Sequence, residues 1–341
     1  MVYQDYKFGV EIEFKGVDLA QATRDLQAAL AGTGIQVEHE GYNHNTRPHW
    51  KVTTDATVTQ RGYNYRTGDG IGGEIVSPIL TGQAGFDEAK KVIDALAGLQ
   101  GIYVDTACGV HVHLSWVGMD TQTVKNVVRR YADYETVIDG WMPRSRRGNN
   151  NRSWCASTVG QFSSTVARFT GSRLTDFASL CLGRYYKVNI YQLRRDGYGT
   201  VEFRQHGGST DSTKILNWVK FLMAFVEASK TANLTTAGST NYRRQRKIAY
   251  GEVREQVAAQ GWELRFANTH YKLVNEHGVM VERLEFSTMD SMYEDNSRRL
   301  NQFFVTWFTG HFGTGSADDV FAGVETEVVD YLNARAAHFA A

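Results

Sequence analysis

Hydrophobic and polar residues alternate near the N-terminus, over residues 9–14 (Gly-Val-Glu-Ile-Glu-Phe). Successive side chains of an extended strand point to opposite faces, so Glu11 and Glu13 share one face, roughly 7 Å apart, and the apolar residues share the other. The pattern predicts a half-buried strand with one oily face and one acidic face. A solvated surface is the ordinary explanation of such a glutamate pair, and a ligand-binding face is the alternative.

Two further stretches have the composition of strands and carry isolated acidic groups. Residues 50–55 (Trp-Lys-Val-Thr-Thr-Asp) are rich in β-branched residues and predict a strand that ends at Asp55. Residues 72–80 predict a strand stopped by Pro78, and Glu74 is the single charge within it. Because aspartate at a strand end is commonly a turn former, Asp55 fits either a turn or a ligand position.

Two histidines occupy the next strand-like stretch, residues 108–115 (Cys-Gly-Val-His-Val-His-Leu-Ser). Alternation places His111 and His113 on one face, opposite the apolar side chains of the stretch. A single strand histidine is usually a satisfied core residue, whereas two histidines on one face also suit contact with a metal or a phosphate. Both interpretations remain open for this pair.

A carboxylate and a guanidinium are neighbours in the last strand-like stretch. Residues 184–190 and 199–206 predict a strand pair, and Glu202, Arg204 and His206 share a face of the second strand if it is fully extended. The Glu202–Arg204 pair fits a surface ion pair worth well under about 1 kcal/mol. Beside several other acids, the same pair would hold a metal ion and a phosphate together.

Apolar residues at helical spacing predict the helices of the chain. The periodic stretches, of which the first has Asp18 as an expected N-cap, are 18–30, 85–99, 121–140, 296–312 and 318–338. A helix near 248–260 and a small β meander over 261–284 are also predicted. Together with the strands above, these helices predict an α+β fold.

A basic loop follows the helix that ends near residue 140. Residues 143–152 contain four arginines and three asparagines in ten positions. Arginine forks bind carboxylates and phosphates, but exposed charge runs are also common on solvated surfaces. The loop therefore fits either a grip on an anionic substrate or simple exposure.

Composition narrows the class of protein. The chain has 341 residues with 42% hydrophobic content, which suits a packed globular protein, and its 37 basic and 37 acidic residues balance. Whole-chain charge therefore gives no argument for a nucleic-acid or membrane partner.

The N-terminus lacks an apolar signal region, and no run approaches about 18 uninterrupted apolar residues, so we expect a cytoplasmic protein with no membrane partner. Cys108, Cys155 and Cys181 are widely spaced, which favours reduced buried thiols over disulfides.

Six of these stretches occur in an order that resembles the putative amidoligase family, which belongs with the glutamine synthetase and glutamate–cysteine ligase superfamily of carboxylate–amine ligases. The resemblance covers roughly residues 7 to 230, and its motifs are Gly-Val-Glu-Ile-Glu-Phe, Trp-Lys-Val-Thr-Thr-Asp, Gly-Glu-Ile-Val-Ser-Pro, Cys-Gly-Val-His-Val-His, Tyr-Lys-Val-Asn and Thr-Val-Glu-Phe-Arg. It implies a curved antiparallel sheet flanked by helices, as in glutamine synthetase. The concave face is then expected to bind ATP with Mg²⁺ or Mn²⁺ ions.

The resemblance also implies roles for individual residues. The expected metal ligands are Glu11, Glu13, Asp55, Glu74, His111 and Glu202. Arg204 is expected to bind phosphate and His113 to lie near the nucleotide, and these two residues with Glu202 form the expected catalytic set. By a looser correspondence, the basic loop supplies a clamp for a carboxylate substrate, formed by Arg146, Asn149 and Arg152.

The implied function is an ATP-dependent carboxylate–amine ligase. A substrate carboxylate would attack the γ-phosphate to give an acyl phosphate, and an amine would then displace phosphate to form an amide or isopeptide-like bond. The substrates are expected to be small-molecule or peptide carboxylates and amines. The alternative is a degenerate ligase fold that binds nucleotide, RNA or a protein partner without catalysis.

The family motifs stop near residue 231, which suggests a domain boundary. We expect an amidoligase-like catalytic domain over residues 1–233 and a C-terminal α/β appendage over 241–341, with a small-residue stretch and a basic run, residues 242–247, between their cores. The appendage is weakly similar to the HicA-type RNA-binding toxin fold, in which His270 would take the place of a catalytic histidine. Nucleic acid is accordingly a possible partner of this appendage, and a cap or an oligomerisation element is the alternative.

Overall fold

The structure, a computed structural model, describes residues 5–147, 154–158, 169–180, 183–194, 199–231 and 320–340, the strands 263–267, 270–274 and 280–285, and positions 258, 261 and 277. The chain divides into two compact units, one comprising Met1–Ala232 with Gly315–Ala341 and the other Asn233–Thr314. This division differs from the predicted boundary, because the last part of the chain groups with the N-terminal unit.

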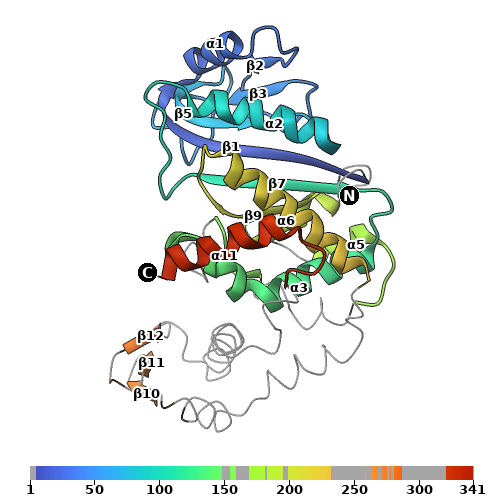
Figure 1. The fold of residues 1–341 in the computed structure, drawn as a ribbon, viewed down its shortest axis with the longest axis vertical. Coiled ribbons are helices and arrows are strands. Elements are labelled where there is room, and N and C mark those ends of the chain that lie inside the picture. Colours follow the sequence, from blue (N-terminus) through green and yellow to red (C-terminus); the bar gives the residue numbers. More distant parts are fainter. Residues whose placement is uncertain are drawn as a thin grey trace. The chain divides into compact units, whose positions relative to one another are not determined.

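The first unit is built on a mixed sheet that is flanked by helices and does not close into a barrel (Figure 1). Among the described residues its main path runs, in spatial order, through β2 (Val37–His39), β3 (Trp50–Thr53), β5 (Asp69–Val76), β1 (Tyr6–Asp18), β7 (Gly109–Trp116), β9 (Val201–Gly207) and β8 (Val188–Asn189). Two short strands extend it, β4 (Arg61–Asn64) beside β5 and β6 (Leu80–Thr81) beside β1. The predicted α+β class is confirmed. The expectation of a wholly antiparallel sheet needs one correction, because β2 and β3 run parallel.

β1 lies at the centre of the sheet and pairs with β5 on one side and β7 on the other. Its apolar positions are nearly inaccessible to solvent, at 2% exposure or less, and they are Tyr6, Phe8, Val10, Ile12 and Phe14. The alternation in the sequence therefore determines the faces of this strand as predicted. One face enters the core, and the glutamates lie on the other.

Helices cover the apolar face. The described α-helices of this unit are α1 (Leu19–Ala29), α2 (Gly82–Ala97), α3 (Thr121–Gly140), α5 (Leu174–Leu180), α6 (Ser212–Lys230) and α11 (Thr326–Ala340), the last of which packs on other helices. The ring of Phe8 in β1 packs 4.9 Å from that of Phe86 in α2, and the ring of Phe203 in β9 packs 5.7 Å from that of Tyr131 in α3. The Asp18 side chain accepts a hydrogen bond from the Gln21 N–H at 2.9 Å, so the predicted N-cap of α1 is confirmed.

β9 contains a bulge that changes which residues face the site. Its pairing with β7 slips by one residue between Phe203 and His206. His206 consequently returns to the helix-covered face, where it is 2% exposed and its ring lies 5.9 Å from that of Trp218 in α6. The expectation that His206 shares a face with Glu202 and Arg204 is wrong, because it assumed a regular strand.

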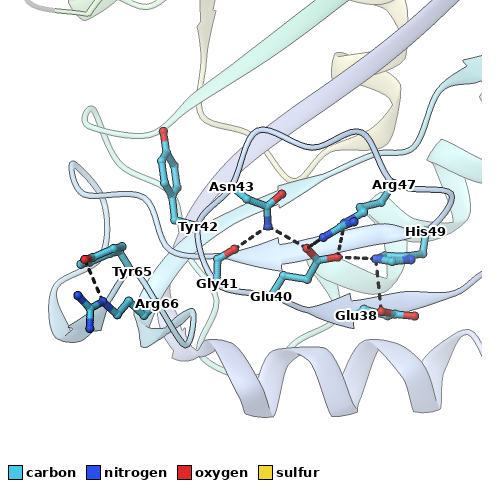
Figure 2. Close-up of a pocket in the computed structure, with 9 residues that line it drawn as sticks. All are labelled: Glu38, Glu40, Gly41, Tyr42, Asn43, Arg47, His49, Tyr65 and Arg66. Carbon is cyan, nitrogen blue, oxygen red and sulfur yellow. Dashed lines mark hydrogen bonds and ion pairs between the residues drawn. The ribbon is translucent and has the colours of Figure 1, made fainter.

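The connection between β2 and β3 folds around the carboxylate of Glu40 (Figure 2). The Arg47 guanidinium donates to both oxygens of this carboxylate, at 2.9 and 3.0 Å, and Asn43 Nδ2 donates to Oε2 at 2.8 Å. His49 Nε2 lies 2.8 Å from Oε1. Burial alone would raise the pKa of Glu40, but these partners outweigh it and hold the pKa at about 2.

The C-terminal helix belongs to the first unit because it packs on α3 and α6. Val320, Val328 and Leu332 are buried, and Arg335 donates two hydrogen bonds to the Trp141 carbonyl at 2.8 and 3.0 Å. Part of the predicted apolar stripe of residues 318–338 is thus buried, although the regular helix begins only at Thr326.

The second unit contains a three-stranded antiparallel sheet, with β10 (Glu263–Ala267), β11 (His270–Val274) and β12 (Met280–Glu285) in that order. This is the predicted meander. The other predictions for this region, the helices near 248–260 and 296–312 and the basic run 242–247, lie essentially outside the described residues.

Two observations bear on the compositional predictions. Cys108 and Cys155 are free and buried, as predicted, and Cys181 lies outside the described residues. In the part of the chain that the structure describes, no helix combines the length and the apolar character needed to cross a bilayer.

Candidate active site

Strand register brings the predicted site residues together on the face of the sheet that lies opposite the helices. Glu11 of β1 is paired with His111 of β7, and Glu13 is paired with Glu74 of β5. His113 of β7 is in turn paired with Glu202 of β9. Directly paired residues of neighbouring strands have side chains on the same face. A row of carboxylates and imidazoles therefore crosses the middle of the sheet.

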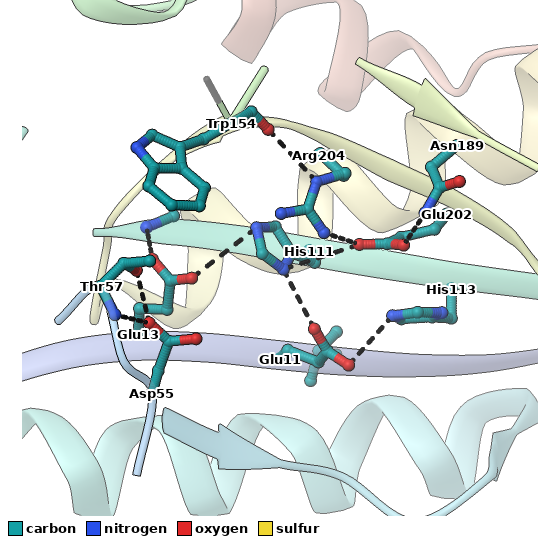
Figure 3. Close-up of polar contacts among 12 residues, drawn as sticks. Glu11, Glu13, Asp55, Thr57, His111, His113, Trp154, Asn189, Glu202 and Arg204 are labelled. Atoms are coloured by element: carbon teal, nitrogen blue, oxygen red, sulfur yellow. Dashed lines mark hydrogen bonds and ion pairs between the residues drawn. The ribbon is translucent and has the colours of Figure 1, made fainter. Parts of the chain in front are cut away.

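Glu11 lies between the two histidines (Figure 3). Its Oε2 is 3.0 Å from His111 Nδ1, and its Oε1 is 3.2 Å from His113 Nε2. His113 Nδ1 contacts the Thr200 hydroxyl at 2.9 Å, whereas its buried Nε2 makes no hydrogen bond of acceptable geometry. Nε2 of His113 is thus directed at the Glu11 carboxylate within the cluster.

Glu202 connects this cluster to Arg204. One Glu202 oxygen accepts a hydrogen bond from Arg204 Nη1, and the other accepts one from Asn189 Nδ2 at 2.6 Å. Arg204 Nε donates to the Trp154 carbonyl at 3.3 Å. Among the described residues, Arg204 Nη2 has no acceptor. The guanidinium is therefore held on two sides and has one free donor nitrogen.

The remaining acids crowd against Glu11 on the β5 side. Glu13 Oε2 accepts the Gly109 N–H at 2.6 Å, and Asp55 Oδ1 accepts the N–H of Thr57 at 2.7 Å. Within the described part of the chain, the Glu74 carboxylate has neither a hydrogen-bond partner nor an ion-pair partner. Burial raises the pKa of Glu74 well above its ordinary value, and the charges of Glu11, Asp55 and Glu13 raise it further.

The same interactions raise the pKa of some carboxyl groups of the cluster and lower the pKa of others. Burial raises the pKa of Glu13, with a further contribution from Asp55. Burial also opposes ionisation of Glu11, but the neighbouring histidines outweigh it and hold the pKa of Glu11 well below its ordinary value. Although burial lowers the pKa of His113, the Glu11 carboxylate overcomes this effect and raises the pKa to about 9. Glu13 and Glu74 thus resist ionisation, whereas Glu11 is ionised beside the histidines.

Arg146, one of the three residues predicted to clamp a substrate, lies against the first residue of β7. It is 3% exposed, and its Nη2 donates to the Cys108 carbonyl at 2.6 Å. Its charge lowers the pKa of Glu13, although burial, the larger influence, raises it. Arg146 therefore meets the cluster from within the protein, while Asn149 and Arg152 lie outside the described residues.

Three further residues lie near the cluster that the sequence pattern did not predict as site residues. Asn189 faces Glu202 because β8 and β9 pair these two positions, and Thr200 orients His113. Lys51 is 4% exposed, and its Nζ donates to the Asn43 carbonyl at 2.7 Å. The alternation Trp50-Lys51-Val52 already indicates that Lys51 lies on the polar face, whereas nothing local identifies Thr200.

A buried ion cluster supports the β8–β9 side of the site from the helix side. Lys187 is fully buried, and its Nζ donates to Glu135 at 2.8 Å and to Asp139 at 2.6 Å, both on α3. The Lys187 carbonyl accepts the Arg204 N–H at 2.8 Å. The backbone that carries Arg204 is thereby tied to α3 through a fully paired charge.

Comparison with known proteins agrees with this geometry. No curated protein is similar enough to be matched to the chain. The family described as putative amidoligase enzyme matches residues 4–226, which include every described residue of the cluster. The match spans more than half of the chain, and the predicted membership is confirmed. The chain belongs to the putative amidoligase family.

Proposed function

We propose that this protein is an ATP-dependent carboxylate–amine ligase that forms an amide bond through an acyl phosphate, on a sheet of the glutamine synthetase type. The observation that supports this most directly is the position of Arg204. Its guanidinium is anchored on a cluster carboxylate, and within the described part of the chain its Nη2 has no acceptor. Sites that transfer phosphoryl groups combine carboxylate-bound cations with such an arginine.

The donor set fits divalent cations such as Mg²⁺ or Mn²⁺. Hard cations prefer carboxylate oxygens, and here the Glu74 carboxylate has no hydrogen bond and no ion pair among the described residues. The residues that would hold the ions are Glu11, Glu13, Asp55, Glu74, His111 and Glu202. When bound, the cations would neutralise the charge of the ATP phosphates and of the transferring phosphoryl group.

The chain's own residues would orient and stabilise the reacting groups. Arg204, held by Glu202 and by the Trp154 carbonyl, would direct Nη2 at an oxygen of the γ-phosphate. A substrate carboxylate oxygen would form a bond to the γ-phosphorus as the bond to ADP breaks. The amine nitrogen would then bond to the acyl carbon, releasing inorganic phosphate and a proton.

A degenerate, non-catalytic member of the family is the competing candidate. The predicted acids and imidazoles of the described sheet all lie on one face, and a protein that only uses the fold as a scaffold has no need of this arrangement. A binding role for the second unit is compatible with either candidate. The catalytic proposal is therefore preferred for the first unit.

A phosphate-release screen tests the proposal. The full chain would be incubated with ATP, Mg²⁺ or Mn²⁺, and panels of carboxylates and amines, while calorimetry measures ATP binding with and without metal. We expect metal-dependent ATP binding, a higher melting temperature with metal and nucleotide together, and phosphate release that depends on a substrate pair. ATP binding without substrate-dependent release would favour the degenerate alternative. Absence of metal-dependent binding would refute the ligase.

A further inference from the structure

A second polar region lies at the β2–β3 end of the same sheet. It is a pocket of about 730 Å³ formed by the loop after β2 and by the turn after β4 (Figure 2). Its lining includes Glu38, Tyr42, Arg47, His49, Tyr65 and Arg66. The volume is within the range of small-molecule sites, roughly 300 to 1,000 Å³.

The two loops that form this pocket, the Tyr42 pocket, are fixed against one another. The Tyr42 N–H donates to the Tyr65 carbonyl at 2.7 Å, and His39 Nε2 lies 2.8 Å from the Gly68 carbonyl oxygen. A Cβ on Gly41 would come within 2.7 Å of the Arg66 carbonyl carbon, so the backbones approach more closely than any other residue permits. The pocket is thus largely preformed.

The Tyr42 pocket and the carboxylate cluster lie on the same face of the sheet, because register aligns Glu38 with Lys51, Lys51 with Val76, and Val76 with Glu11. The Tyr42 phenol lies within electrostatic reach of Glu74 and Asp55, and the Lys51 ammonium lies within reach of both Glu74 and the pocket carboxylate Glu40. Lys51 also donates to the carbonyl of Asn43, a pocket residue. The end of the pocket beside Lys51 therefore faces the cluster.

Strand order determines which reactant the pocket suits. Arg204 lies on β9 and the cluster lies chiefly on β1, β5 and β7, whereas the pocket lies beyond β3, at the opposite end of the sheet. If ATP occupies the Arg204 side, as the proposed function requires, the pocket remains for a second substrate. In the proposed reaction the amine of that substrate has to reach the acyl group, so the amine lies at the end nearer the cluster.

The pocket side chains indicate what the far end of that substrate carries. The Arg66 guanidinium packs 5.6 Å from the Tyr65 ring centre, and its Nε donates to the Tyr65 hydroxyl at 3.0 Å. Among the described residues, its two terminal nitrogens have no acceptor, whereas Arg47 is committed to Glu40. A planar fork of this kind recognises a carboxylate. The exposed rings of Tyr42 and Tyr65 suit an apolar stem between the two charges.

We propose that the Tyr42 pocket binds the amine substrate of the ligase, and that this substrate is a primary amine with a carboxylate on the same molecule, recognised by Arg66. The inference rests on the proposed function for the assignment of the amine. The existence of the carboxylate-binding pocket does not depend on it, so the two can fail separately.

Ligand-observed NMR on the full chain tests the pocket directly. The probes are phenylalanine and glycylphenylalanine, each compared with its C-terminal amide, with and without Mg²⁺ and a non-hydrolysable ATP analogue. We expect the free acids to bind about tenfold more tightly than the amides, as one charge-assisted interaction provides. Arg66→Gln should reduce this preference to less than about twofold, and Arg61→Gln, which removes an exposed arginine of β4 outside the pocket, should retain it.

Each other outcome has a definite meaning. Equal binding of acids and amides, persistence of the preference in Arg66→Gln, or no binding of any probe would overturn the pocket proposal. If the acid preference depends on Arg66 but metal-dependent ATP binding is absent, the pocket stands and the ligase fails. If ATP binding is intact and the acid preference is absent, only the pocket proposal fails.

Discussion

Glu202 and Arg204 are neighbours on one face of β9, but their proposed tasks differ. Glu202→Gln keeps the side-chain shape and removes the negative charge that a cation needs, so metal dependence should move to about tenfold higher concentration. Arg204→Lys keeps the charge and loses the planar fork, so kcat should fall by about 10² to 10³ while ATP affinity changes less. Steady-state kinetics and nucleotide calorimetry measure both effects.

A control variant tests whether the loss of kcat is specific to Arg204. Arg24→Lys alters an exposed arginine of α1 that bonds only to Gln21 among its described contacts, and it should leave kcat unchanged. If Arg204→Lys also turns over at the wild-type rate, the pair is a structural ion pair, and Arg204 has no part in the mechanism.

Glu40 provides a pH-dependent stability prediction. Its folded pKa of about 2 lies below the ordinary carboxyl value of 4.5, so its ionised form stabilises the fold above about pH 4.5. That contribution is lost as pH falls towards 2. Glu40→Gln should lower the free energy of unfolding at pH 7 by on the order of 1 kcal/mol, an amount reduced by solvent at the pocket mouth.

Urea unfolding of wild type and Glu40→Gln at pH 7, 4.5 and 3 measures this contribution. The gap between the two proteins should narrow steadily towards low pH. A gap that is independent of pH would mean that Glu40 acts through packing rather than through its charge.

At the scale of elements, the contact of β3, β5 and α1 depends on Gly73. A Cβ at this position would collide with the Thr53 carbonyl oxygen and lie 2.9 Å from a methyl group of Leu19. Gly73→Ala should therefore separate β3 from β5, lower the free energy of unfolding by about 1–3 kcal/mol, and weaken metal binding through the adjacent Glu74. Thermal unfolding and metal titration measure the two consequences.

Gly140 is a suitable comparison because a Cβ there meets nothing within 4 Å. Gly140→Ala, near the end of α3, should be neutral or should stabilise the protein by up to about 1 kcal/mol. Equal effects of the two substitutions would show that backbone flexibility, and not the close approach at Gly73, dominates.

At the scale of the whole molecule, the first unit needs the end of the chain. Truncation after Ala232 would remove Val320, Val328 and Leu332 from the core and leave the Trp141 carbonyl without Arg335. We expect a lower melting temperature and a red-shifted tryptophan emission, because burial of apolar side chains contributes about 1.5–3 kcal/mol each.

Point variants locate the cause of that destabilisation. Arg335→Gln should lower the free energy of unfolding by about 1 kcal/mol, because it removes hydrogen bonds from a partly buried carbonyl. Glu325→Gln breaks the exposed Lys220–Glu325 pair at 3.4 Å and should change it by well under about 1 kcal/mol. A truncated chain as stable as the full chain would show that α11 contributes nothing to the core.

The sequence by itself determined the faces of the strands and the identity of most site residues. Alternation with period two is a local property, so it assigns Glu11 and Glu13 to one face before any partner strand is known. The helices over residues 18–30 and 121–140 follow for the same reason, since helical spacing and capping are also local. Family membership rested on the order of such local motifs.

Only the tertiary structure decided how these faces meet. Strand register sets Glu11 against His111 and His113 against Glu202, and register depends on pairing between residues about a hundred positions apart. The bulge that turns His206 towards Trp218 arises from that same pairing, so no local pattern reveals it. Contacts between distant segments likewise decide that α11 belongs to the first unit and that two loops approach to form the Tyr42 pocket. Packing free energy depends on the whole fold and not on any one stretch of sequence.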